Sequence, residues 1–459
     1  MFRGVQYATA ARFAAPVRVT SWTGTRDATA FGPAAPQPVG GPLDGLVPGS
    51  FRGATDEGAC LTLNVFTPDG GSEPKPVLVW FPGGAFTIGA ASQPAYDATT
   101  FAAEQDVVLV TCNYRLGALG FLDTRDAGGA SNCGLRDAIA ALEWVHDNIA
   151  AFGGDPGRVS VFGESAGGGM VLHLCASPRA AGLFRGAIVQ SGATFNTLDT
   201  ARAALVRDAV LSELGLTDAK DLIDVPVATL LAAQSAAAMA LLASVGMMPF
   251  HPMVDGDVLL EPPAAALAAG AAAGIPMVIG TTTDEMRLFV DVSGPAPERA
   301  KLCRRVARYT GVDDARADEI VATYETELPD ADTNDIWASL FTDVEMQQPA
   351  AAMRDAHRAH GPVYSYLFGW PATNPLLGAC HGIDIPFTFA TFDDGWAEFV
   401  GADDDARALS SMIRNAWAAF ARDGNPGWPV APAMMRFDRD SGVVDDPLRN
   451  RLASLPQKG

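Results

Sequence analysis

The sequence has few histidines, few cysteines and no long uninterrupted apolar run. No stretch reaches the roughly 18 apolar residues of a membrane-spanning helix. Residues 1–19 lack the basic-then-apolar layout of a signal peptide, because Arg3 and Arg12 interrupt them. None of the six cysteines forms a C-x-x-C pair, so neither a zinc site nor a redox motif is indicated. We therefore expect a cytoplasmic protein with no metal site.

Basic residues are also scarce. The chain carries 32 lysines and arginines against 53 aspartates and glutamates, which gives a net charge of −21. An acidic surface repels nucleic-acid phosphates and anionic lipid headgroups, so we expect neither nucleic acid nor a membrane surface as a partner. The apolar content of 48% and the charged content of 19% are typical of a globular protein, and 459 residues are enough for a large core.

Short apolar segments alternate with helical patterns along the chain. Such segments are typical of strands that are buried on both faces of a parallel sheet. They are residues 76–81, 106–114, 158–163, 186–192, 276–280 and 363–368. The clearest helical pattern lies in residues 132–154, where apolar side chains recur at spacings of three and four. The alternation predicts an α/β fold with a mostly parallel central sheet flanked by helices.

Two long helix-rich intervals interrupt this alternation, at residues 193–275 and 285–362. No linker rich in proline or serine separates either interval from the strands around it. We therefore interpret residues 1–459 as a single domain. In this interpretation both intervals are helical insertions over the carboxyl edge of the sheet, where they form a cap or gorge.

Residues 158–171, RVSVFGESAGGGMV, contain a G-x-S-x-G pattern between a predicted strand and a predicted helix. The pattern alone is a weak signal in a chain with 47 glycines. The strand–turn–helix context is stronger, because such a turn exposes a serine hydroxyl at the sheet edge as a nucleophile. Side chains at Gly163 and Gly167 would collide across the turn. The helix start directs backbone N–H groups toward negative charge forming beside Ser165. The alternative is a purely structural turn.

A serine nucleophile needs a base, and the chain offers six histidines. On this kind of sheet the chain order is serine, acid, histidine, so histidines that precede the acid are disfavoured. His381, in the glycine-flanked loop GACHGIDIPF, is then the best candidate. The others are His146 on an amphipathic helix, His173 and His251 before any plausible acid, and His357 and His360 on a charged helix where a solvated face is expected.

The acid is expected at the same sheet edge, after another strand. Residues 276–280 run directly into TTTDEM, which supplies Asp284 and Glu285. Ligands of open α/β sheets bind beyond the carboxyl ends of the strands, where this loop emerges. The carboxylate would orient the imidazole and stabilise its protonated form. Position alone does not separate the two carboxylates.

A longer series of motifs covers nearly the whole chain in order. The series is FRGVQYA, ATAFGPAAPQ, CLTLNVFTP, WFPGGAF, NYRLGALGF, NCGLRDAIAALEWVHDNIAAFGGDP, VFGESAGG, VQSGA, PMVDGDVL, GTTTDEM and GACHGIDIPF. It resembles the type-B carboxylesterase family, which comprises α/β-hydrolases related to cholinesterases and bacterial p-nitrobenzyl esterases. The resemblance implies the α/β-hydrolase fold, with Ser165 as nucleophile, His381 as base and Glu285 as acid. Asp284 would be the structural neighbour of the acid.

By the same resemblance, WFPGGAF implies an oxyanion hole made of the backbone N–H groups of Gly84, Ala85 and Ala166. The sequence departs from the family pattern twice here, since Pro82 replaces a histidine and Ala85 replaces a glycine. Neither replacement removes a needed donor. Ala85 keeps its N–H group, and Pro82 precedes the donors.

Three polar residues match positions that surround the acid and the base in the family. They are Glu164, Ser191 and Asp384, the last of which lies three residues past His381. The resemblance implies that they support the catalytic residues. The alternative, equally weighted, is that each satisfies backbone groups only.

The sequence therefore predicts a serine carboxylesterase that hydrolyses small-molecule esters and needs no cofactor. One alternative is an adhesion or scaffold protein that kept the fold and lost the chemistry. Another is a hydrolase of amides, carbamates or lactones, because these reactions use the same catalytic groups.

Overall fold

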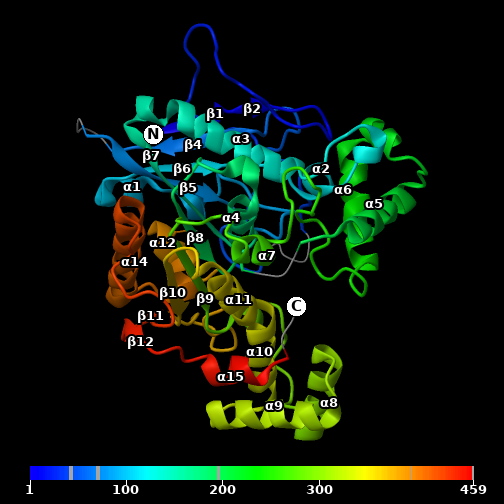
Figure 1. Cartoon of the computed structure of the whole chain (residues 1–459), viewed down its shortest axis with the longest axis vertical. Helices are drawn as coiled ribbons and strands as arrows, with labels where there is room; N and C mark the ends of the chain where they lie inside the picture. The colour runs from blue at the N-terminus through cyan, green and yellow to red at the C-terminus, as the bar shows by residue number, and fades with distance from the viewer. Residues whose placement is uncertain (41–44, 69–72, 194–196, 394, 457–459) are drawn as a thin grey trace.

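The computed structural model describes residues 1–40, 45–68, 73–193, 197–393 and 395–456, and a large twisted sheet runs through its centre (Figure 1). Within these ranges one sheet has ten strands, in the order β1-β4-β6-β5-β7-β8-β9-β10-β11-β12. They are β1 (Phe2–Gln6), β4 (Thr62–Phe66), β5 (Lys75–Phe81), β6 (Val108–Cys112), β7 (Gly154–Glu164), β8 (Gly186–Gln190), β9 (Met277–Thr282), β10 (Val363–Phe368), β11 (Met434–Phe437) and β12 (Gly442–Val444). A separate hairpin pairs β2 (Ala8–Thr9) with β3 (Val17–Arg18).

The centre of the sheet is parallel and its edges are antiparallel. All neighbours from β6 across to β11 pair in parallel, whereas β1, β4 and β12 pair antiparallel. The predicted α/β fold with a mostly parallel sheet is confirmed. The sequence pattern did not predict strands β1, β4, β11 and β12. Strands β1, β11 and β12 are short and partly exposed, so they lack a continuous apolar run. Strand β4 is buried, but the polar residues Thr62 and Asn64 interrupt its apolar pattern.

Both faces of the central strands are covered, as β5 illustrates. Val77, Val79 and Phe81 pack into one hydrophobic core, whereas Leu78 and Trp80 pack into a second core on the opposite face. The split follows from the alternation of side chains along a strand. A strand with two buried faces needs apolar residues at every position, which is why these segments read as uninterrupted apolar runs.

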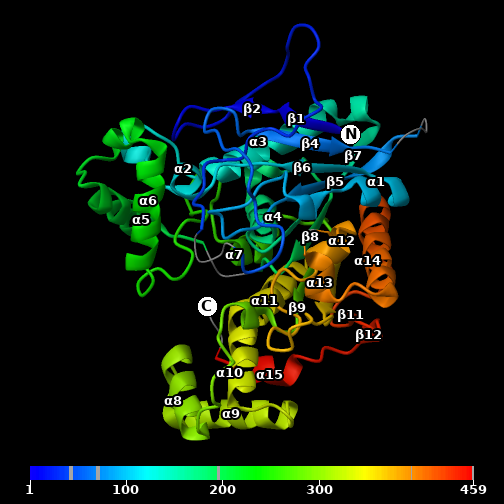
Figure 2. The same cartoon turned by 180° about the vertical axis from the view of Figure 1, so that it is seen from behind.

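The helices form a layer on each face of the sheet. Helices α3, α4, α7 and α11 contribute to the first core, and α1, α12 and α14 contribute to the second (Figures 1 and 2). The helices are α1 (Thr99–Gln105), α2 (Gly117–Phe121), α3 (Cys133–Asn148), α4 (Ala166–Ala176), α5 (Thr200–Leu214), α6 (Val227–Ala240), α7 (Pro263–Ala268), α8 (Arg299–Thr310), α9 (Asp314–Glu327), α10 (Thr333–Thr342), α11 (Gln348–His357), α12 (Ile385–Phe389), α13 (Trp396–Val400), α14 (Asp404–Asp423) and α15 (Arg449–Ser454). In the described part of the chain, none of them has the length and apolar character needed to cross a bilayer.

The two long intervals between strands differ in how they pack. Helices α5, α6 and α7, between β8 and β9, contribute side chains to the first core. Between β9 and β10, helices α8 to α10 instead form a separate hydrophobic cluster that includes Ile320, Trp337 and Leu455 from the C-terminal segment. Figures 1 and 2 both place α8 and α9 at the end of the molecule far from β5. Helices α8 to α10 therefore have a small core of their own, whereas α11, in the same interval, packs into the first core.

Candidate active site

Ser165 lies on a sharp turn between β7 and α4. Its backbone has φ 56° and ψ −125°, a conformation that residues with a side chain rarely adopt. The N–H group of Ser165 donates to the carbonyl of Gln190 at the end of β8, at 2.9 Å. The strained turn therefore carries the serine at the carboxyl edge of the parallel strands, which is the context expected for an exposed nucleophile.

Glycines allow this turn to pack against two strands. A Cβ atom on Gly163 would lie 2.4 Å from the backbone of Gly167, so a side chain there would collide across the turn. For Gly167 the obstacle is different, because its Cβ atom would lie 1.9 Å from the carbonyl oxygen of Phe81 on β5. Gly168 approaches Gly192 after β8, where the corresponding distance is 2.9 Å. The glycine run thus fits the start of α4 between β5 and β8.

We expect Gly167→Ala to lower the free energy of unfolding by about 3 kcal/mol, because the new methyl group would overlap a backbone carbonyl. Gly169→Ala is the matched control, since its methyl group would lie 3.4 Å from the Phe86 ring. In a helix alanine is favoured over glycine by about 1 kcal/mol, so this control should keep or gain stability. Urea unfolding of both variants measures the difference. Equal stabilities would contradict the close approach of α4 to β5.

His381 and Glu285 complete a hydrogen-bonded chain with the serine. His381 Nε2 lies 2.8 Å from Ser165 Oγ, and His381 Nδ1 lies 2.6 Å from Glu285 Oε2. The three residues follow β7, β9 and β10, whose carboxyl ends meet at the same edge of the sheet. The other carboxylate oxygen of the fully buried Glu285 accepts the N–H of Thr282 at 2.8 Å. Both carboxylate oxygen atoms of Glu285 therefore have a hydrogen-bond partner.

Asp284, the other carboxylate of TTTDEM, points elsewhere. Its Oδ2 accepts the N–H of Ala379 at 3.1 Å and the hydroxyl of Thr283 at 2.7 Å, and its Oδ1 lies 3.2 Å from Arg287 Nε. Asp284 therefore connects its own loop to the loop that leads to His381. Sequence position did not separate Asp284 from Glu285, but in the structure the Glu285 carboxylate points toward His381 and the Asp284 carboxylate points toward Ala379.

The remaining histidines lie outside the chain of hydrogen bonds that joins Ser165, His381 and Glu285. His146 is exposed beside Asp147, and His173 is buried in α4 with Nδ1 2.7 Å from the Gly169 carbonyl oxygen. The prediction of a solvated face was wrong for His357, which is fully buried with Nε2 2.7 Å from the carbonyl oxygen of Ile275. The remaining two are His251, buried beside the Pro252 carbonyl, and His360, whose Nε2 lies 2.8 Å from the carbonyl oxygen of Ala268.

The loop after β5 carries two of the expected oxyanion donors. Gly84 and Ala85 both have positive φ, at 113° and 53°, and a Cβ atom on Gly84 would lie 2.3 Å from the carbonyl oxygen of Ile88. Within the described ranges, neither of their N–H groups has a hydrogen-bond acceptor. Ala166 is the first residue of α4, so its N–H group has no partner within the helix. Three candidate donors are thus available at the sheet edge. Ala85 adopts a positive φ, a backbone conformation that glycine adopts more readily.

A second buried carboxylate faces the imidazole. Glu164 Oε1 lies 3.4 Å from His381 Nε2 and has no hydrogen-bond partner in the part of the chain that the structure describes. Burial raises the pKa of Glu164 to about 8. Burial alone would lower the pKa of His381, but the nearby carboxylates of Glu164 and Glu285 outweigh it and raise that pKa to about 9. The histidine is therefore a stronger base than an isolated imidazole.

Asp384 and Ser191 are the other two polar residues that the sequence placed around the acid and the base. Asp384 accepts hydrogen bonds from Gln190 Nε2 at 2.9 Å and from the Tyr366 hydroxyl at 3.3 Å, and burial raises its pKa to about 6. Its second oxygen, like the hydroxyl of Ser191, is buried without a partner among the described residues. Ser191 has a positive φ of 47°. Both residues are buried, and in the described part of the chain neither forms a hydrogen bond with Ser165 Oγ.

Two further residues contribute contacts that the sequence did not reveal. Gln190 accepts the Ser165 N–H group through its carbonyl and donates to Asp384 through its side chain. The ring of Phe289 lies 5.6 Å from the His381 ring, measured between centroids. No motif marks either residue, because each contact depends on how distant segments pack.

We expect Glu164→Gln to move the acid limb of the pH profile of kcat/KM to a pH about 1 unit lower. The histidine must be neutral to accept the serine proton, and the negative charge of Glu164 favours its protonated form. Removing that charge lowers the pKa of His381, so the neutral form persists at lower pH. Asp384→Asn is the control and should shift the limb less, since Asp384 contributes least to the raised pKa of His381. An unchanged limb in Glu164→Gln would contradict the coupling.

In the described part of the chain, no three His, Cys, Asp or Glu side chains are grouped as metal ligands.

A surface groove of about 1120 Å³ is lined by segments around Phe31, residues 45–54 and Phe399. Ser92 and Pro94 also line this groove, and in the sequence they come shortly after the loop that carries Gly84 and Ala85.

The fold and this arrangement define a class, the α/β-hydrolases, with a serine, a histidine and a glutamate at the carboxyl edge of the sheet. The model of the Carboxylesterase family matches residues 1–442, and the chain belongs to this family. It is accordingly a carboxylic ester hydrolase.

Relatives of the chain match along nearly its whole length. The para-nitrobenzyl esterase of Bacillus subtilis (strain 168) is 37% identical over 98% of this chain and 92% of its own. The phenmedipham hydrolase of Pseudarthrobacter oxydans is 34% identical over 97% of this chain and 90% of its own. The solved structure of a thermophilic PNB esterase superposes with a TM-score of 0.87 at 34% identity, covering 99% of this chain and 95% of that one.

Proposed function

We propose that this carboxylesterase acts through an acyl-enzyme on Ser165, with His381 as the base and Glu285 as the acid of the triad. The observation that carries the proposal is the unbroken chain of contacts of 2.8 Å and 2.6 Å that joins the three side chains. A serine hydroxyl becomes a nucleophile only when an adjacent base removes its proton, and the imidazole is within reach to do so. The small-molecule ester substrate and the cytoplasmic location predicted from the sequence are part of this proposal.

In the first half-reaction Ser165 Oγ attacks the ester carbonyl while His381 Nε2 accepts the hydroxyl proton. Glu285 accepts a hydrogen bond from Nδ1–H, which keeps the correct tautomer and stabilises the imidazolium. The negative charge on the carbonyl oxygen is stabilised by the N–H groups of Gly84, Ala85 and Ala166, where each donor contributes about 3 kcal/mol. His381 then gives its proton to the leaving alcohol, and the acyl group remains on Ser165.

In the second half-reaction a water molecule takes the place of the alcohol. His381 accepts a proton from the water, whose oxygen attacks the acyl carbonyl, and the same three N–H groups stabilise the second oxyanion. Proton return to Ser165 Oγ releases the carboxylic acid. Glu164, Ser191 and Asp384 are proposed to tune the charge and orientation of His381. The helices of residues 193–275 and 285–362 are proposed to be insertions of a single domain that form the cap of the site.

Labelling with a fluorophosphonate probe tests the nucleophile. The probe is expected to modify the native chain once, on a peptide that contains Ser165, and to leave Ser165→Ala unlabelled. Absence of labelling in a folded native chain would instead favour the scaffold alternative. Because the Bacillus subtilis relative is a para-nitrobenzyl esterase, p-nitrobenzyl and p-nitrophenyl esters are the first substrates to compare. An anilide of equal size, measured alongside, separates ester from amide hydrolysis.

A further inference from the structure

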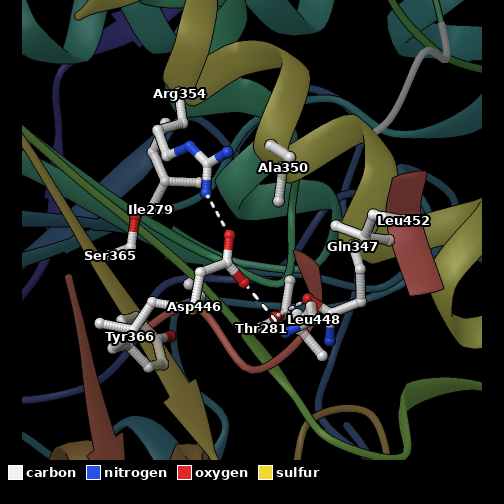
Figure 3. Close-up of a pocket in the computed structure, with 13 residues that line it drawn as sticks. Ile279, Thr281, Gln347, Ala350, Arg354, Ser365, Tyr366, Asp446, Leu448 and Leu452 are labelled. Atoms are coloured by element: carbon white, nitrogen blue, oxygen red, sulfur yellow. Dashed lines mark hydrogen bonds and ion pairs between the residues drawn. The ribbon is translucent and has the colours of Figure 1, made fainter. Parts of the chain in front are cut away.

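The C-terminal segment, which contains Asp446 and helix α15, forms two ion pairs with residues between β9 and β10. In one, Arg354 Nη1 of α11 lies 3.3 Å from Asp446 Oδ2, beside a cavity of about 20 Å³ (Figure 3). A space of that size holds roughly one water molecule, so the cavity is no ligand site. In the other, Arg451 Nε of α15 lies 3.0 Å from Asp343 Oδ2. Arg354 and Arg451 thus each form an ion pair that holds the C-terminal segment against the rest of the protein.

Asp343 is fully buried at the start of a π-helix, Asp343–Gln347. The Tyr324 hydroxyl donates to it at 2.7 Å, and Arg451 Nη2 lies 3.2 Å from its second oxygen. Burial raises the pKa of Asp343 to about 6, and Arg451 opposes this rise. A buried carboxylate without its cation is strongly destabilising. Arg451 therefore supplies the charge that this carboxylate needs.

Both ends of the π-helix contact the loop that carries Glu285. Thr342, just before it, accepts the N–H of Met286 through Oγ1 at 3.1 Å. Gln347, its last residue, donates to the carbonyl of Thr282 at 2.9 Å and accepts the hydroxyl of Thr281 at 2.5 Å. Figure 3 shows Gln347 reaching Thr281 from the helix beside the cavity. The strand end before Glu285 and the residue after it are thus attached to one helical turn.

The π-turn is what allows both attachments together. It has one more residue per hydrogen-bonded turn than an α-helix. Such turns are rare in proteins, and those that occur are often found at functional sites. Conversion to α-helix would rotate Gln347 relative to Thr342 by about 100°. Gln347 would then leave the end of β9 while Thr342 stayed on Met286.

We propose that Arg451 is a positioning residue for Glu285. By neutralising Asp343, it stabilises the π-turn whose two ends orient the loop from Thr281 to Met286. The inference rests on the proposed role of Glu285 as the acid of the triad. The C-terminal helix, distant from Ser165 in sequence, thereby contributes to the geometry of the His381–Glu285 contact.

Arg451→Met tests the proposal, with Arg354→Met as the matched control. Both variants remove one arginine from an ion pair to the same C-terminal segment, but only Arg451 contacts the start of the π-helix. In Arg451→Met we expect kcat for p-nitrophenyl acetate to fall about 10- to 100-fold, because small misplacements of a catalytic group cost up to about 100-fold. KM should stay within about twofold, since ground-state binding is untouched. The acid limb of kcat/KM should move to lower pH, because a displaced Glu285 no longer raises the pKa of His381.

Arg354→Met should lower the melting temperature yet keep kcat and the pH profile. Asp343→Asn/Arg451→Met, which removes both charges, should recover most of the lost kcat; this double variant carries the test if the single variant does not fold. The proposal is overturned by a folded Arg451→Met with native kcat and pH profile, by an equal loss of kcat in Arg354→Met, or by a double variant no better than the single one. If Glu285→Gln also keeps its activity, the proposed function fails as well. If Glu285→Gln is inactive, only this inference fails.

Discussion

Ser165→Ala is expected to lower kcat for p-nitrophenyl esters by about a million-fold, as loss of the nucleophile does in other serine hydrolases. No other described hydroxyl donates to His381 Nε2, which lies 2.8 Å from Ser165 Oγ. The backbone donors of Gly84, Ala85 and Ala166 remain in the variant, so a small rate above that of water should persist. Stopped-flow and steady-state release of p-nitrophenol measure the loss, and the burst of acyl-enzyme formation should disappear.

Ser191→Ala is the matched control for this variant. Ser191 also follows a strand of the parallel sheet and also has a positive φ, yet its hydroxyl has no partner among the described residues. We expect kcat to stay within about tenfold of the native value, the range of an indirect effect on orientation. A million-fold loss in Ser191→Ala, or a retained burst in Ser165→Ala, would move the nucleophile away from Ser165.

Glu285→Gln is expected to lower kcat by about 10,000-fold with little change in KM. An amide at this position presents an N–H group to His381 Nδ1, which favours the tautomer that carries its hydrogen on Nε2. That hydrogen would point at Ser165 Oγ, so the imidazole could no longer accept the serine proton. The charge that stabilises the imidazolium is lost as well. Steady-state kinetics and single-turnover acylation measure both consequences.

Asp284→Asn is the matched control, because the two carboxylates are adjacent in sequence and point in different directions. Asp284 accepts the N–H of Ala379 and the hydroxyl of Thr283, and it pairs with Arg287. Its loss should cost about 1 kcal/mol of stability and leave kcat within about tenfold. A larger loss of kcat in Asp284→Asn than in Glu285→Gln would exchange the roles of the two residues.

Much of the architecture could be predicted from residue patterns. The six apolar segments correspond to β5 to β10, because strands buried on both faces need apolar side chains at every position. Ser165 was predicted from its turn, since strain and close packing demand glycines at fixed positions around it. His381 was favoured by chain order and by its glycine-flanked loop, after His357 and His360 had been set aside because of their charged helix. In each case local sequence and fold topology impose the same requirement.

Other features depend on packing that sequence does not encode locally. Nothing in TTTDEM indicates that Glu285 turns inward while Asp284 turns toward Ala379. The burial of His357 arises from its contact with Ile275, 82 positions away, which a charged helical pattern conceals. The ion pair between Asp343 and Arg451 spans 108 positions and depends on where α15 packs. Such contacts are set by tertiary structure, so only coordinates reveal them.

The long sequence separations within the site have a consequence for biosynthesis. Ser165 and His381 lie 216 positions apart, and the glutamate lies between them, 96 positions before the histidine. The base is synthesised 216 residues after the serine, and contacts this distant close slowly during folding. A nascent or truncated chain that ends before β10 has the reactive serine but no means to activate it. Hydrolytic activity is therefore expected only after β10 has joined the sheet and placed the loop that carries His381.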